Sequence, residues 1–341
     1  MPSRRALLGR LATVGLLGTS AAGVSSGSTA AAAAPTDAIP PVDGDTVATA
    51  VVDPAAVQTV GLPEPWSARL SAATACADVS LDDVNSVTGS LALSQDGPEG
   101  AVVVRGSFDP DDLSAAVERR GRWSATRTRR GGRTVRRLRA RGEPYAVAVT
   151  RNALVVGHAP TVDRAGSHVD AAVDRVDGSG ADDPLARYGS LPAIASGDAA
   201  VYADLGEAGR TRLESALSGA PAALRASVEA AGSIGVALDG DAGRGDEAGL
   251  RYAATLDPTR LTRERLRRLS GGVDAEGALD GAAVRLRGRT VVVDATPTRE
   301  ELFAVHDDIL SGRDDFPSNR DGSAPDRNGP ATDDAGFESG R

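Results

Sequence analysis

The chain is organised by the segment SVTGSLALSQDGPEGAVVVRGSFDPDDLSAAVE (86–118), in which an apolar run, a turn rich in Gly and Asp, a second apolar run and an Asp-Pro pair follow one another. The same order of features returns in GSIGVALDGDAGRGDEAGLRYAATLDPTRLTRERL (232–266). Short apolar runs joined by such turns are typical of antiparallel strands, and Asp before Pro is a frequent helix start. The two copies therefore predict strand, turn, strand and helix, written twice.

The repetition extends in both directions. Residues 144–174 and 281–309 each read as strand, Arg-bearing turn, strand, proline and helix, and residues 45–57 resemble residues 198–210. We therefore expect a duplicated α+β fold of two similar units, each an antiparallel sheet with helices on one face. The predicted organisation is a signal peptide at 1–34, a linker at 35–44, a first unit at 45–178, a joint at 179–197, a second unit at 198–310 and a disordered tail at 311–341.

Local signals mark where helices are expected to begin. Asp109 and Asp257 each precede a proline, which places an N-cap residue before the residue type favoured at the first helical position. Thr298 and Glu301 have the spacing of a capping box, in which the two side chains bond each other's backbone N–H groups. These patterns predict helices after 109, 257 and 298.

Composition indicates an acidic globular protein. Hydrophobic residues make up 41% of the 341 residues, which suffices for a core, and aromatic residues only 3%, so Val, Leu and Ala must fill that core. All 38 basic residues are Arg, and 47 acids give a formal net charge of −9. This Lys-free, acidic composition resembles that of proteins from halophilic archaea. A GC-rich bacterium, such as an actinobacterium, is the alternative source.

The N-terminus has the layout of an export signal. A basic start with Arg4 and Arg5 precedes an apolar run over 7–24 and a small-residue stretch over 30–34, where we expect cleavage. The arginine pair resembles the twin-arginine motif, so the twin-arginine translocase is an expected partner and the mature protein is expected outside the cell or in its envelope. Glycines and Arg10 interrupt the apolar run, which predicts no stable membrane span. An uncleaved, Arg-rich cytoplasmic end is the alternative interpretation.

The most unusual surface is predicted for residues 119–142, RRGRWSATRTRRGGRTVRRLRARG, which contain 11 Arg and no acid. The two adjacent glycines suit a tight turn, so the segment reads as a β-hairpin with alternating guanidinium groups. Guanidinium groups bind phosphate, sulfate and carboxylate in bidentate geometry. The candidate residues for binding an anionic partner are Arg127, Arg129, Arg130, Arg133, Arg136, Arg137 and Arg139.

Three interpretations of this hairpin compete. It packs on acids of its own chain, such as Asp111-Asp112, Asp182-Asp183 or the acidic tail; it docks on an anionic envelope component, such as an acidic surface glycoprotein or a polysaccharide; or it binds nucleic acid. Trp123 is the only aromatic residue among the arginines, so the stacking platform of single-strand binders is missing. Export also argues against nucleic acid, and we expect no such partner.

Catalytic and metal-binding patterns are not found in the sequence. The single cysteine, Cys76, lies among small apolar residues, and the three histidines, His158, His168 and His306, have no zinc-type spacing. The segment DGDAGRGDE (239–247) resembles a calcium loop, but glycine occupies its fifth position, so a turn is the better interpretation. We predict no catalytic residue, no metal site and no cofactor.

The order of strands and helices in the mature chain resembles that of exported, functionally uncharacterised proteins of halophilic archaea and, more distantly, of bacterial envelope proteins of the DUF3352 type. The resemblance implies an envelope protein and contributes no catalytic residues. The function expected from the sequence is that of an exported, non-enzymatic binding or envelope-associated protein whose Arg-rich hairpin contacts an anion. The alternative is a hydrolytic enzyme with its site in the cleft between the two units.

Overall fold

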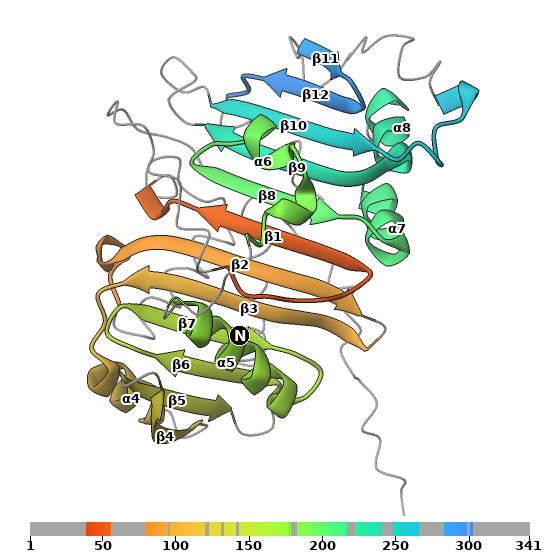
Figure 1. Ribbon diagram of the computed structural model, residues 1–341. Helices are drawn as coiled ribbons and strands as arrows, with labels where there is room; N and C mark the ends of the chain where they lie inside the picture. Colours follow the sequence, from red (N-terminus) through yellow and green to blue (C-terminus); the bar gives the residue numbers. More distant parts are fainter. Residues whose placement is uncertain are drawn as a thin grey trace, which may run out of the picture. The chain divides into compact units, whose positions relative to one another are not determined.

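A computed structural model gives the protein one 12-stranded antiparallel sheet in the order β11-β12-β10-β9-β8-β1-β2-β3-β7-β6-β5-β4 (Figure 1). The predicted signal peptide, the tail, Asp182, Cys76 and His306 lie outside the described residues, as does most of the calcium-like loop. All described residues belong to one compact unit within 1–311. The structure describes residues 39–55, 79–94, 96–119, 123–130, 133–140, 143–176, 178, 183–216, 222–239, 248–265, 283–298 and 301–302.

Strands alternate with short helices along the chain. The strands are β1 (Thr46–Val52), β2 (Val84–Ser94), β3 (Gly97–Gly106), β4 (Trp123–Arg130), β5 (Arg133–Ala140), β6 (Tyr145–Val149), β7 (Ala153–His158), β8 (Ala199–Asp204), β9 (Ala231–Asp239), β10 (Gly249–Leu256), β11 (Ala283–Arg287) and β12 (Thr290–Ala295). The helices are η3 (Leu81–Asp83), α4 (Pro110–Glu118), α5 (Val162–Val176), η4 (Ala186–Tyr188), α6 (Leu191–Ile194), α7 (Glu207–Ala216) and α8 (Ala222–Ala230).

The strand order is the same on both sides of the central pair, β1 and β8. Outward from β1 it runs β1-β2-β3-β7-β6, and outward from β8 it runs β8-β9-β10-β12-β11. β1 and β8 are antiparallel, with Val47 opposite Asp204 and Val52 opposite Ala199. The predicted α+β class is confirmed, and the segments predicted as two units contribute to one continuous sheet. The β4–β5 hairpin extends the first half beyond β6.

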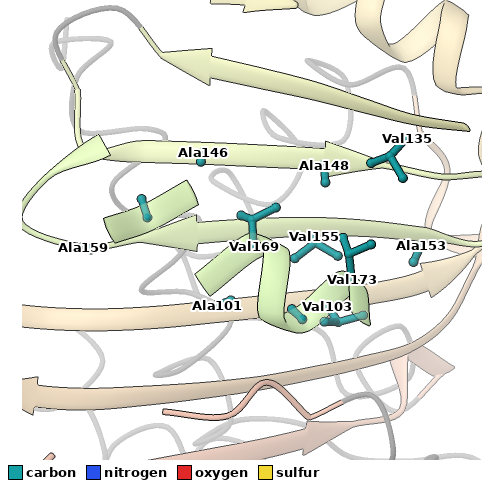
Figure 2. Packing of buried hydrophobic residues seen from close by; sticks show 12 residues of the cluster. Ala101, Val103, Val135, Ala146, Ala148, Ala153, Val155, Ala159, Val169 and Val173 are labelled. Carbon is teal, nitrogen blue, oxygen red and sulfur yellow. The ribbon is translucent and has the colours of Figure 1, made fainter. Parts of the chain in front are cut away.

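Helices cover both faces of the sheet, so the expectation of helices on one face is wrong. Ala148 and Val149 are neighbours in β6, and successive residues of a strand point to opposite faces. Ala148 lies in the same cluster as Val169 of α5 (Figure 2), whereas Val149 lies in the same cluster as Leu113 of α4. This part of the sheet is therefore a buried layer between α4 and α5.

Gly157 allows α5 to lie close to β7. A Cβ at Gly157 would lie 2.5 Å from the carbonyl oxygen of Ala165 and 2.7 Å from Cγ2 of Val169, both in α5. Close-packed interiors do not admit such approaches, so the glycine fixes how near the helix packs to the sheet. On the helix itself, a Cβ at Gly166 would have Arg139 Nη2 as its nearest neighbour, at 3.7 Å.

The local helix signals have mixed outcomes. Asp109 is the N-cap of α4, because its carboxylate accepts hydrogen bonds from two backbone N–H groups of the first turn. Thr298 and Glu301 form the predicted capping box, with the Thr298 N–H donating to Glu301 Oε2 at 2.8 Å. The helix predicted directly after Asp257 is wrong: a turn follows this residue, and helical residues begin at Arg263.

The segment predicted as a joint packs on the sheet. Within it, η4 and α6 place Tyr188, Leu191 and Ala195 in a buried cluster with residues of β8, β9 and β10. The hydroxyl oxygen of Tyr188 lies 2.7 Å from Oγ1 of Thr49, a buried residue of β1. The segment therefore belongs to the core at the point where the two halves of the sheet meet.

Candidate functional site

The Arg-rich segment forms the β4–β5 hairpin at one end of the sheet. The two strands pair from Trp123 opposite Ala140 to Arg130 opposite Arg133, and β5 also pairs with β6. β4 is therefore an edge strand among the described strands. The structure describes the backbone of Arg130 and Arg133 but not their side chains, so their place in the site stays a prediction.

The arginines of the hairpin divide between the two faces of the sheet. Arg127 lies opposite Arg136 in the register, so both side chains point to the face that α4 covers. Arg137 and Arg139 ion-pair with residues of α5 on the opposite face. Because helices flank the hairpin on both sides, each face has acids within reach.

On the α4 face, Asp111 contacts two arginines. Its Oδ1 accepts a hydrogen bond from Nε of Arg136 at 2.7 Å, and its Oδ2 lies 3.5 Å from Nη2 of Arg127. The hydrogen bond from Arg136 is the main cause that lowers the pKa of the Asp111 carboxyl below its usual 3.8. The side chains of Asp111 and Arg127 are each 59% exposed, so water screens their contact and it adds little stability.

On the α5 face, two further acids pair with the hairpin. Arg137 forms an ion pair with Asp170, and Nη1 of Arg139 lies 3.3 Å from Oδ1 of Asp163. Asp163 and Asp170 are separated by about two helical turns, so they lie on the same side of α5. The sequence named Asp111 as a possible internal partner of the hairpin, but it did not single out these two acids of α5.

Arg129 differs from the other arginines whose side chains are described. It is exposed on β4, two positions after Arg127 and on the same face. No ion pair joins it to another described residue, whereas Arg136, Arg137 and Arg139 each pair with an acid. Among the hairpin arginines whose side chains the structure describes, Arg129 and the loosely paired Arg127 therefore direct their charge at solvent on the face that α4 covers.

A second charged cluster, which the sequence did not reveal, lies between β3 and α5. Glu99 exposes 7% of its side chain; its Oε1 accepts a hydrogen bond from Nη2 of Arg164 at 2.6 Å, and its Oε2 lies 3.2 Å from Nε2 of His168. Arg164 also lies 3.3 Å from Asp96. Each oxygen of the buried carboxylate thus has a partner on α5, which fastens the helix to the sheet. Glu99 falls in the Gly- and Asp-rich segment that the sequence predicts as a turn, whereas β3 begins at Gly97.

His158 lies at the end of β7 beside this cluster. Its Nδ1 donates a hydrogen bond to the carbonyl oxygen of Pro98 at 2.9 Å, and its ring centroid lies 4.8 Å from that of Tyr145. Burial is the main cause that lowers the pKa of His158 below 6.5, and burial likewise raises the pKa of Tyr145 to about 12. In the folded protein, burial therefore favours the neutral form of the His158 imidazole, which packs against the uncharged Tyr145 side chain.

This histidine makes stability depend on pH. In the unfolded chain His158 has a pKa of about 6.5, and its folded pKa is lower, so the unfolded state binds the proton more readily as pH falls. Its contribution to stability is complete above pH 6.5 and is lost as pH falls through the folded value. We expect His158→Phe, which keeps the ring contact with Tyr145, to flatten the fall in unfolding free energy between about pH 7 and pH 5. Urea titrations at both pH values measure this; an equal fall in unfolding free energy for the wild type and the variant would show that His158 does not cause the pH dependence.

Among the residues that the structure describes, no group of three or more His, Cys, Asp or Glu side chains is arranged to hold a metal ion. Across the same ranges, no helix has both the length and the apolar character that crossing a membrane requires.

The comparisons with known proteins give a structural likeness alone. The sequence matches no protein-family model and no curated protein. The chain is similar in structure to TP0453. Crystal form III of that protein aligns with a TM-score of 0.49 and 14% identity, over 80% of this chain and 96% of TP0453. Crystal forms I and IV give TM-scores of 0.49 and 0.46 at 14% identity, each over 82% of this chain and 99% of TP0453.

Proposed function

We propose that the protein is an exported, non-enzymatic binding protein that holds an anionic component of the cell envelope on the β4–β5 hairpin. The observation that carries the proposal is the exposed pair Arg127 and Arg129 on one face of an edge strand. Acids of α4 and α5 pair with Arg136, Arg137 and Arg139. The proposed contact is therefore narrower than the full set of arginines that the sequence indicates.

The pair is suited to an acidic polymer. Residues two positions apart on a strand lie about 7 Å apart, so a chain that presents carboxylate or sulfate groups at similar intervals engages both guanidinium groups. Among the described contacts, Arg127 gives up its 3.5 Å approach to Asp111 when it turns to such a ligand, and Arg136 still neutralises that carboxylate. Binding of the anionic polymer therefore costs the folded protein little stability.

The proposed location follows from the export signal. Arg4 and Arg5 are the proposed recognition pair for the twin-arginine translocase, which would place the protein at the envelope, where acidic glycoproteins and polysaccharides are available partners. At about 1 M salt the screening length falls to about 3 Å, so in a salt-rich setting only direct guanidinium–anion contacts persist. A bidentate contact from a strand edge meets that requirement.

The test compares two double variants that remove the same charge from opposite faces of one hairpin. In Arg127→Gln/Arg129→Gln the solvent-directed pair is removed, and we expect retention on isolated cell envelopes to fall about tenfold or more, since a charge-assisted hydrogen bond contributes about 2 kcal/mol. In Arg137→Gln/Arg139→Gln the pairs with α5 are lost, and we expect unchanged retention with about 1 kcal/mol less stability. Co-sedimentation with envelopes and thermal unfolding give the two readouts.

The opposite pattern would overturn the proposal. If Arg127→Gln/Arg129→Gln is retained like the wild type and loses stability instead, the hairpin serves its own fold. If both variants lose retention equally, net charge rather than the exposed face governs binding, and the assignment to Arg127 and Arg129 is wrong.

A further inference from the structure

The far end of the sheet carries a second edge strand of different character. All five residues of β11 are exposed, on both faces of the strand. Leu286 is 67% exposed and Val284 36%, and they are the large hydrophobic residues that the described part of the chain leaves at the surface. An apolar row on an edge strand is a surface that other chains recognise.

The first half of the sheet contains a strand in the same position, and there it is covered. β6 occupies the place in the order β1-β2-β3-β7-β6 that β11 occupies in β8-β9-β10-β12-β11. Four of its five residues are buried. β5 pairs along its outer side, with Arg136 opposite Val149 and Arg139 opposite Ala146, and α5 packs on it as well. The fold itself thus shows what occupies this position: another strand.

Hairpin geometry determines which backbone groups of β11 point away from β12. β11 and β12 are joined by a two-residue turn, with Arg287 opposite Thr290 and Gly288 at a positive φ of 61°. Antiparallel pairs alternate between hydrogen-bonded and non-hydrogen-bonded, and the pair beside a two-residue turn is hydrogen-bonded. The N–H and C=O groups of Val284 and Leu286 therefore point away from β12, toward the side of β11 on which no other described strand lies.

The two faces of β11 specify the chemistry of a strand that would lie beside it. Val284 lies opposite Val293 and Leu286 opposite Val291, so one face continues an apolar row. The other face carries Arg285, which pairs with Asp294, and the exposed Arg287. An added strand fits if its apolar side chains alternate with acidic ones. A second copy of β11 or β4 fits poorly, because it would bring arginine against arginine.

We propose that β11 is a docking edge for an extended segment of another protein, alternately apolar and acidic, which adds to the sheet beside Val284 and Leu286. Main-chain hydrogen bonds give the affinity, and the apolar and arginine faces give the selectivity. This surface is separate from the β4–β5 hairpin and does not depend on the function proposed for it.

The test uses the full chain and a nine-residue synthetic peptide in which valine and glutamate alternate. The matched control peptide has the same composition with its valines and glutamates in two blocks. We expect only the alternating peptide to bind and to slow hydrogen exchange at the amides of Val284 and Leu286. In Leu286→Pro the outward N–H is lost while the hairpin bonds remain, so we expect binding about tenfold or more weaker with an unchanged melting temperature. Arg287→Glu, which keeps the backbone donor, is expected to weaken binding about fivefold.

Several results would overturn the proposal. If both peptides bind equally, or if neither Leu286→Pro nor Arg287→Glu changes the binding, the peptide associates with the protein without adding to the sheet as a strand. Protection at Val284 and Leu286 in the free protein that disappears on removing residues 303–341 would assign the edge to the chain's own segment. Protection that depends on protein concentration would assign it to a second copy. Loss of binding in Arg127→Gln/Arg129→Gln would move the site to β4.

Discussion

Replacing Gly157 with valine is expected to lower the free energy of unfolding by about 3 kcal/mol, because overpacking a rigid contact forces backbone movement. The new Cβ would lie 2.5 Å from the Ala165 carbonyl oxygen, and this backbone atom cannot turn aside as a side chain can. Helix α5 must then lift from β7, which opens the cluster around Val155 and Val169 (Figure 2). For a chain of this size the loss corresponds to a melting temperature lower by roughly 4 °C, because the entropy of unfolding grows with chain length.

Gly166→Ala is the matched control for this prediction. The added Cβ has Arg139 Nη2 as its nearest neighbour, at 3.7 Å, and alanine favours a helix over glycine by about 1 kcal/mol. We expect this variant to be as stable as the wild type or more so. If Gly157→Val melts at the wild-type temperature, the close approach of α5 to β7 does not hold in solution.

Replacing Tyr188 with alanine is expected to cost about 4 kcal/mol, the range for removing a large aromatic side chain from a core. Tyr188 exposes only 2% of its surface and packs with Leu191 and Tyr202, whose ring centroid lies 5.6 Å away. Its loss would detach the segment between the two halves from the middle of the sheet. Urea unfolding of the variant measures the cost.

Tyr188→Phe separates the ring from the hydroxyl. This variant keeps the packing and loses the 2.7 Å hydrogen bond with Thr49 Oγ1, which retains a second partner in Ser90 Oγ at 3.1 Å. We therefore expect a cost of about 1 kcal/mol, the usual net contribution of one hydrogen bond. If Tyr188→Ala also loses only about 1 kcal/mol of unfolding free energy, the segment that carries η4 and α6 is a linker, as its Gly- and Pro-rich composition suggests.

The sequence predicted the local structure well where one segment carries its own signal. The Asp109 cap, the Thr298–Glu301 box and the hairpin around the two glycines each depend on residues close together in the chain. A signal for the second covered face was also present: Ala101 to Val104 is a continuous apolar run, which is typical of a strand buried on both sides. The prediction of helices on one face rested on the same apolar runs and the turns between them, and did not take the continuous run as a sign of burial on both faces.

The rest depended on contacts between distant segments. That Asp163 and Asp170 meet the arginines follows from α5 packing beside β5, and no spacing in the sequence reports which helix lies there. Tyr188 and Leu191 are flanked by glycine, proline and serine, so local composition favoured a linker. Glu99 follows a turn, and its burial becomes visible only once α5 places Arg164 over it.

The central pair of the sheet also has a kinetic consequence. Pairs such as β2–β3, β9–β10 and β11–β12 join strands that are neighbours in the chain, so these hairpins can form early. The β1–β8 pair joins Val52 to Ala199, and closing so long a loop delays it. Until then β1 and β8 are open edges without a single arginine, unlike β4 and β11. The slow step of folding is then also the stage at which a nascent copy is most prone to pair with another.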